Sequence, residues 1–197
     1  MIKIAILFVS ILFSGCSMKD VSKPIIKYTI EDNTVISKES VPLNKVLKIA
    51  HLKSPKYIKN NNIWYKKPSF EVNTYLYAMW NEDFVHLVEE DLAKTIYNSG
   101  LFTSIFTSHS KIHADVLLEG ALVQARQILN KDNTSHVVFT LRLYAIDAKT
   151  SKLLGSHEFK YLQNCETTNA KGAIVSYNKI IKNLNKDVLA WLKKLMI

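Results

Sequence analysis

The chain has 197 residues, which is enough for one well-packed domain. It carries 26 Lys and Arg residues against 17 Asp and Glu residues, giving a formal net charge of +9. Two cysteines exclude a disulfide-rich scaffold, and five glycines leave little room for the Gly-rich loops that bind nucleotide phosphates. The composition therefore favours a single basic globular domain.

The first fifteen residues have the three parts of a bacterial secretory signal. Lys3 supplies a positive charge, residues 4–13 are apolar except for Ser10, and small residues precede Cys16. The apolar run has about ten residues, whereas a membrane-spanning helix needs about twenty. We therefore expect residues 1–15 to be removed as a signal peptide. The alternative is a buried N-terminal helix that ends in an ordinary cysteine.

Residues 12–16, with the sequence LFSGC, resemble the bacterial lipobox, although Phe13 stands where Leu is usual. The resemblance implies that the sulfur of Cys16 takes a diacylglycerol and that Cys16 becomes the mature N-terminus. Two or more acyl chains hold a protein stably on its membrane. An Asp after the cysteine retains enteric lipoproteins at the inner membrane. Ser17 therefore favours the outer membrane, with the protein facing the periplasm.

Export restricts the partners that the basic charge could attract. Loss of Lys3 with the signal leaves 182 residues with a formal net charge of +8. We expect no nucleic-acid partner, because the polyanions outside the cytoplasm are phospholipid headgroups, lipopolysaccharide and acidic protein faces. General solubility is the alternative explanation of the charge. Cys165 is left without an intramolecular partner, so it is either a buried or half-buried thiol or part of an intermolecular disulfide.

The mature chain reads as one domain, residues 27–197, behind a lipidated tether, residues 16–26. A short strand is expected at residues 27–30 and another at residues 46–52, which Pro55 ends.

Two further β-rich runs, residues 63–65 and 70–77, bring several aromatic residues together. These rings form either a contact surface for a partner or the core beneath the first helix. The candidate surface consists of Trp64, Tyr65, Tyr75, Tyr77 and Trp80.

The first helix is expected at residues 82–99. Asn81 is a suitable N-cap, and Trp80 before it can pack on Val85. Apolar residues then recur at helical spacing, and Gly100 is a natural stop.

Three long β runs follow at residues 115–129, 137–145 and 153–162. Turn-forming residues at 130–134 and a second short turn connect them, which predicts an antiparallel meander. Gly120 predicts a bulge or bend in the first run.

The last segment, residues 170–195, has an unbroken apolar stripe at spacings of three and four. The stripe can cover a sheet, pair in a coiled-coil homo-oligomer or lie on a membrane surface. Covering the sheet is the simplest interpretation, because the sheet needs a partner for its apolar face. The predicted fold is α+β, a largely antiparallel sheet covered on one face by helices at about 82–99 and 170–195.

We find no pattern that indicates catalysis. His109 and His113 have a spacing that could hold zinc on a helix, but they precede a strand in an apparent loop without a third strong ligand. The adjacent carboxylates at residues 89–91 point in different directions on the first helix. We therefore predict no catalytic, cofactor or metal site and no enzyme activity.

Three segments resemble the ABC-type transport auxiliary lipoprotein family. They are residues 75–82 (YLYAMWNE), residues 100–102 (GLF) after the helix, and residues 114–120 (ADVLLEG) at the start of a long strand. The order of lipobox, strands, helix, meander and C-terminal helix covers the mature chain. The Lys- and Asn-rich loop at residues 55–68 departs from the pattern of the family.

The resemblance implies a non-catalytic, lipid-anchored adaptor of an ABC-type lipid transport system. Its partner would be the periplasmic subunit with mammalian-cell-entry domains, which carries lipid between membranes. Two other classes remain open. One is a lipoprotein of envelope assembly, serving lipopolysaccharide or outer-membrane protein insertion, and the other is a periplasmic ligand-binding lipoprotein that acts alone. A deep apolar cavity would favour the last class, and a packed core would disfavour it.

Overall fold

The computed structural model describes residues 23–31 and 38–196. The signal peptide, the lipidated Cys16 and Ser17 therefore lie outside the described residues, as does most of the tether. Within these two ranges, none of the helices combines the length and apolar character that a membrane crossing requires.

The described chain forms one sheet and two helices, as the sequence predicts. In chain order the elements are β1 (Ile26–Tyr28), β2 (Leu43–Ile49), β3 (Asn62–Lys66), β4 (Val72–Trp80), α2 (Phe84–Ser99), β5 (Phe102–Thr107), β6 (Val116–Leu129), β7 (Ser135–Asp147), β8 (Leu153–Asn164) and α3 (Ala170–Met196).

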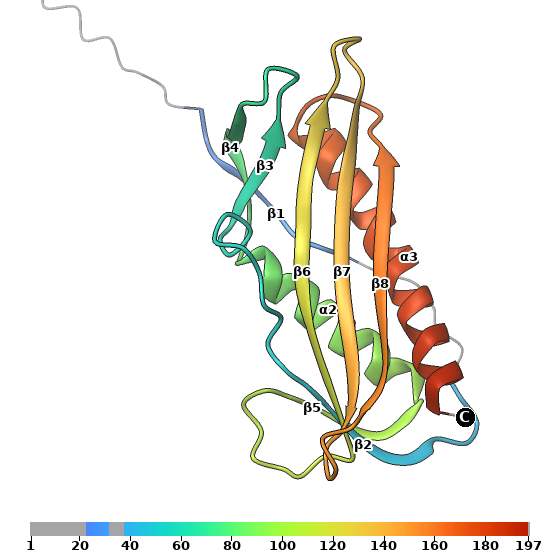
Figure 1. Ribbon diagram of the computed structural model, residues 1–197. Coiled ribbons are helices and arrows are strands. Elements are labelled where there is room, and N and C mark those ends of the chain that lie inside the picture. Colours follow the sequence, from blue (N-terminus) through green and yellow to red (C-terminus); the bar gives the residue numbers. More distant parts are fainter. Residues whose placement is uncertain (1–22, 32–37, 197) are drawn as a thin grey trace, which may run out of the picture.

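Strands β6, β7 and β8 form the expected antiparallel meander, which dominates the view in Figure 1. The other edge of β6 is shared by two strands. Strand β2 runs parallel to the start of β6, and β3 runs parallel to its end. Each of these strands begins a separate wing, β2 with β5 at the bottom of Figure 1 and β3 with β4 and β1 at the top left.

The prediction of a largely antiparallel sheet is correct for the meander and for the β3–β4 pair, but wrong for the other pairs of the wings. Four strand pairs are parallel: β1 with β4, β2 with β5, β2 with β6, and β3 with β6. Parallel neighbours need long crossover connections, and here α2 and the β3–β4 hairpin provide part of the connection between β2 and β5. A sequence of short strands does not reveal which distant strand each will join.

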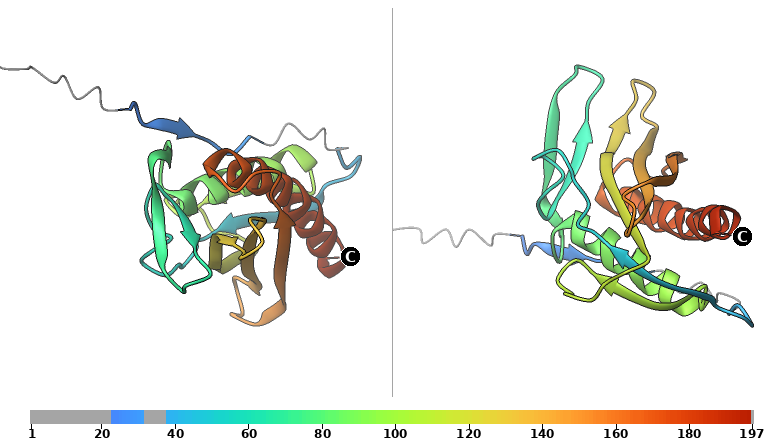
Figure 2. Two further views of the ribbon diagram at one scale, coloured as in Figure 1. Left: turned by 90° about the horizontal axis from the view of Figure 1, so that it is seen from above. Right: turned by 60° about the horizontal axis from the view of Figure 1, so that its bottom comes forward.

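Both helices lie on one face of the sheet, and the apolar core lies between the two layers (Figure 2). The apolar stripe of α3 is buried within the chain, including Tyr177, Ile181, Leu184 and Val188. This agrees with the interpretation that the last helix covers the sheet.

Helix α2 begins two residues later than predicted. Its N-cap is Asp83, whose carboxylate accepts a hydrogen bond of 2.9 Å from the backbone N–H of Val85. Asn81 instead donates its backbone N–H to the carbonyl of Tyr28, which ties β1 to the end of β4. Gly100 ends the helix in the left-handed conformation at φ 64°, as its position in the sequence predicts.

Gly120 is required by a close approach between strands. A Cβ at this position would lie 2.4 Å from the carbonyl oxygen of Arg142 and 2.6 Å from a methyl carbon of Leu143. The irregularity of the β6–β7 ladder lies further along, between Leu122 and Gln124.

Candidate interaction edge and histidine–glutamate notch

Trp80, the last residue of β4, is a core residue. Its side chain is 1% exposed and stacks on Phe84 with 4.6 Å between ring centroids. The edge of Tyr177 from α3 contacts the pair, with 5.4 Å between the centroids of Trp80 and Tyr177. Val85, the contact expected from the sequence, lies in the same core, and the ring contacts of Trp80 with Phe84 and Tyr177 join β4 to both helices.

Tyr75 holds the β3–β4 wing against the rest of the domain. Its hydroxyl donates to Oε1 of Gln127 on β6 at 2.5 Å and lies 3.0 Å from the carbonyl oxygen of Thr168 before α3. Burial raises the pKa of the Tyr75 hydroxyl well above its usual value, with a smaller contribution from Tyr65. The rings of Tyr65 and Tyr75 are tilted against each other with centroids 4.8 Å apart.

Trp64 and Tyr77 are more accessible. The Trp64 ring meets the edge of Tyr57 at 5.9 Å, and its Nε1 donates to Oδ1 of Asn60 at 3.4 Å. Tyr77 is 44% exposed, and the ammonium group of Lys23 lies 5.9 Å from its ring centroid. The five aromatic residues therefore do not lie on one surface, because they divide between the core and the outside of the wing.

An irregularity in β4 explains why part of it is exposed. Asn62 pairs with Met79, and Trp64 pairs with Thr74, so β4 has four residues where β3 has one. The extra residues form a bulge in which Leu76 is 73% exposed. The sequence alone did not indicate this bulge.

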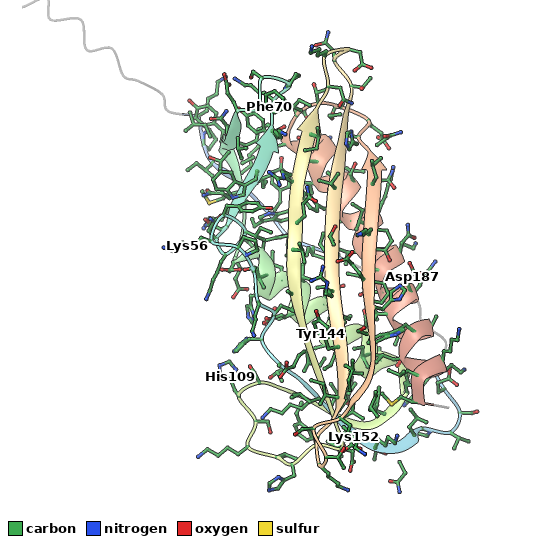
Figure 3. All side chains as sticks on the ribbon, viewed as in Figure 1. Lys56, Phe70, His109, Tyr144, Lys152 and Asp187 are labelled. Carbon is green, nitrogen blue, oxygen red and sulfur yellow. The ribbon has the colours of Figure 1, made fainter. Side chains whose placement is uncertain are left out.

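An exposed apolar surface lies along β1, the β4 bulge and the β3–β4 turn, which we call the N-terminal edge. Phe70 stands at the turn with φ 68° and is 80% exposed. Figure 3 shows it at the tip of the hairpin. The exposed apolar side chains of the N-terminal edge are Ile25, Ile26, Phe70, Val72, Leu76 and Tyr77.

Lysines accompany these apolar side chains. The ammonium group of Lys66 lies 4.9 Å from the Phe70 ring centroid. Lys67 makes an ion pair of 3.0 Å with Glu71, which raises the pKa of the lysine and lowers that of the carboxylate. Lys23 and Lys27 are exposed beside β4. The edge thus combines apolar groups with an excess of positive charge.

A surface depression lies where the chain after β2 meets α2 and the β5–β6 loop. We call it the histidine–glutamate notch, formed by His51, Glu82, His86, Glu89, Glu90 and His109. It consists of two depressions of about 380 and 250 Å³ that share His51, His86 and Glu89. Figure 3 shows His109 well away from Phe70, toward the other end of the molecule.

Glu89 has a structural role in the notch. Its carboxylate accepts a hydrogen bond from the backbone N–H of Leu52 and lies 3.2 Å from Nδ1 of His51. Nε2 of the same histidine is 2.8 Å from Oγ of Ser108, and the His51 and His109 rings meet edge to face at 5.1 Å. These contacts fasten the segment after β2 to α2 and to the β5–β6 loop.

His86 lies between two carboxylates on the exposed side of the notch. Its Nε2 is 3.4 Å from Oε1 of Glu82 and 3.3 Å from Oε1 of Glu90. Ligand atoms of these three residues lie within 4.8 Å of one another, a spacing that could admit a metal ion. In the sequence these three residues follow one another at intervals of four. The zinc site weighed from the sequence, however, concerned only His109 and His113. His109 contacts His51, whereas His113 is exposed in the loop before β6.

No protein-family model matches the sequence, and no curated protein matches it. Among solved structures, protein XCC0632 from Xanthomonas campestris, described as family DUF330, has a TM-score of 0.75 at 12% identity. The match covers 86% of this chain and 96% of that one. The chain shares its fold with XCC0632.

Two other solved structures are more distant. The hypothetical protein CT253 from Chlamydia trachomatis has a TM-score of 0.53 at 7% identity, covering 78% of this chain and 98% of that one. Lipoprotein GNA1162 from Neisseria meningitidis has a TM-score of 0.42 at 10% identity, covering 76% and 98% of the two chains. The TM-scores show that the fold is shared with XCC0632 and CT253.

Proposed function

We propose that this protein is a non-catalytic, lipid-anchored adaptor of the bacterial cell envelope. In this proposal Cys16 carries the lipid, and the domain docks the mammalian-cell-entry subunit of an ABC-type lipid transport system, most favourably from the outer membrane. The lipobox-like residues 12–16 and the family resemblance of residues 75–82, 100–102 and 114–120 support it.

The packed interior is the observation that carries the proposal. The space between sheet and helices is filled by large side chains with less than 2% exposure, including Trp80, Phe139, Leu118, Leu141 and Tyr177. A carrier of one lipid or drug-sized ligand needs a largely apolar pocket of about 300–1,000 Å³. The depressions of the notch lie at the surface, outside the packed core, and their lining combines apolar groups with charged side chains such as Glu82 and Glu89. This arrangement favours a protein that works through its surface over a stand-alone carrier.

We assign partner docking to the histidine–glutamate notch. It is concave, and His86 and Glu90 offer exposed polar groups at its rim. Glu82 follows the end of β4, so the notch lies at the opposite end of that strand from the Phe70 turn. A domain held to the membrane near the N-terminal edge would thus keep the notch free for a periplasmic subunit.

Affinity purification of the lipidated protein from membranes in mild detergent tests the adaptor role. We expect the mammalian-cell-entry subunit to co-purify, and the double variant His86→Ala with Glu90→Ala to lose it while remaining folded. A matched control is Lys179→Ala with Glu166→Ala, an exposed ion pair of 2.8 Å at the start of α3. Recovery of lipopolysaccharide or outer-membrane insertion components instead would support the envelope-assembly class. Recovery of no envelope partner would contradict the adaptor role.

The anchor is tested separately by mass spectrometry of the mature N-terminal peptide. We expect a peptide that begins at Cys16 and carries the mass of attached acyl chains, and Cys16→Ser should abolish both processing and lipid. An unmodified N-terminus in membranes that process a control lipoprotein would contradict the proposal.

A further inference from the structure

We propose that the N-terminal edge is a membrane-contact surface that lies against anionic phospholipid. The inference rests on the proposed lipid anchor at Cys16 and adds to it the face that the domain turns toward the bilayer. Three observations carry it: the short chain between anchor and edge, the exposed apolar side chains, and the lysines among them.

The length of chain between the anchor and the edge is short. Six residues, 17–22, separate Cys16 from Lys23. Since an extended chain advances at most about 3.6 Å per residue, Lys23 stays within roughly 25 Å of the anchored cysteine. Lys23 in turn lies over the ring of Tyr77 in the β4 bulge. The lipid therefore holds this edge close to the membrane surface.

The side chains of the edge suit the boundary between headgroups and acyl chains. Phe70 and Leu76 are largely exposed to water, and Ile25 and Ile26 extend the apolar character along β1. Strand β1 pairs with β4 so that Ile26 lies opposite Ala78, close to the β4 bulge. Exposed apolar groups of this extent mark contact sites, and aromatic and aliphatic side chains bind at membrane interfaces.

The charge of the edge selects the kind of lipid. Lys23, Lys27 and Lys66 have no acidic side chain in ion-pair contact among the described residues, whereas Lys67 is paired with Glu71. A lysine near an anionic membrane strengthens binding about fivefold. Lys66, beside the Phe70 ring, can keep its ammonium group at the headgroups while the ring enters the interface. An anionic phospholipid headgroup is therefore the chemistry that this edge fits.

Vesicle co-sedimentation tests the contact without the lipid anchor. The mature chain from residue 16, with Cys16→Ser, is mixed with phosphatidylcholine vesicles that contain either no phosphatidylglycerol or 30% of it. We expect clear binding only to the anionic vesicles, and a loss of at least about tenfold for Phe70→Ser with Leu76→Ser. The matched control is Leu153→Ser with Leu162→Ser, two exposed leucines on β8. It should change binding less than about twofold. Circular dichroism checks that both double variants fold.

Hydrogen exchange of the lipidated protein provides the second measurement. On anionic vesicles, compared with detergent, we expect slower exchange at residues 66–77 and unchanged exchange at residues 153–162. The membrane proposal is overturned if the unlipidated chain binds no vesicles, or if both double variants lose binding equally. A third outcome also overturns it: the unlipidated chain does not bind vesicles, and the double variant of Phe70 and Leu76 no longer recovers the transporter subunit. That result would make the edge a protein-docking surface. A missing acyl mass on Cys16 would count against the anchor alone, because the vesicle assay does not use it.

Discussion

Replacing Trp80 by alanine should destabilise the domain strongly, whereas replacing Trp64 should have a small effect. The sequence placed both rings in one aromatic segment and left open whether they form the core or a partner surface. The structure buries Trp80 between Phe84 and Tyr177 and leaves Trp64 half-buried beside Tyr57. The two variants therefore separate the two roles within one hairpin.

The magnitude follows from the burial of the ring. A buried aromatic side chain removes about 150–250 Å² from water, which at 25 cal/mol per Å² is worth about 4–6 kcal/mol. Residual compactness of the unfolded chain lowers this to about 3–5 kcal/mol, which is the range measured for core Trp→Ala changes. For a domain of this size the melting temperature should fall by about 6–20 °C. Trp64→Ala loses one edge contact with Tyr57 and a long hydrogen bond to Asn60, and it should cost about 1 kcal/mol.

Urea unfolding followed by circular dichroism measures both changes. The decrease in the free energy of unfolding caused by Trp80→Ala should be at least twice the decrease caused by Trp64→Ala. In the membrane pull-down, Trp80→Ala should lose the partner only to the extent that the variant is unfolded. Equal destabilisation by the two variants, or a folded Trp80→Ala protein that has specifically lost its partner, would refute the assignment of Trp80 to the core.

Three further predictions concern the supports of the wing and the meander. Tyr75→Phe removes the hydrogen bond to the buried β6 glutamine and should lower the free energy of unfolding by about 1–2 kcal/mol, as measured in urea. Gly120→Ala should cost about 1–3 kcal/mol because its methyl group would meet a β7 backbone carbonyl. Gly155→Ala should cost less, because its methyl group would meet only the flexible side chain of Leu195; the reverse order would refute this reasoning. The backbone N–H of Val46, followed by an ion pair with a lysine, lowers the pKa of Asp115. The stabilisation from Asp115 is therefore present above its unfolded pKa of about 4 and is lost as pH falls below it. The difference in unfolding free energy between wild type and Asp115→Asn should shrink from pH 7 to pH 3, and a constant difference would contradict the assignment.

The helices and the meander could be predicted because their signals are local. Alternation at residues 137–145 and the stripe at residues 170–195 each lie within one element, and their burial agrees with the pattern. The N-cap was misplaced by two residues because Asn81 and Asp83 are both good capping residues. The sequence pattern does not show that Asn81 is used to bind β1. The parallel wings depend on which distant strands pair with the start and the end of the β6 edge opposite β7, and tertiary packing makes that choice.

The candidate surfaces were harder to predict for the same reason. The bulge in β4 and the contact of Tyr75 with Gln127 depend on how β4 pairs with β3 and packs on β6, and the sequence of residues 70–77 gives no sign of either. The notch brings His51 from the end of β2 onto Glu89 of α2, which only the fold can show. By contrast, the contact of His86 with Glu90 follows from a spacing of four on one helix face and could be predicted from the sequence. Glu82 reaches the same histidine from just before the N-cap Asp83.

The central claim is that the lipidated domain binds a transport subunit through its surface. The most direct measurement is purification of the wild-type lipidated protein from membranes in mild detergent, followed by mass spectrometry of the proteins recovered with it. The proposal predicts that the mammalian-cell-entry subunit is recovered and that it is lost with the His86→Ala and Glu90→Ala variant. A lipidated, folded protein that recovers no transporter subunit would contradict the claim.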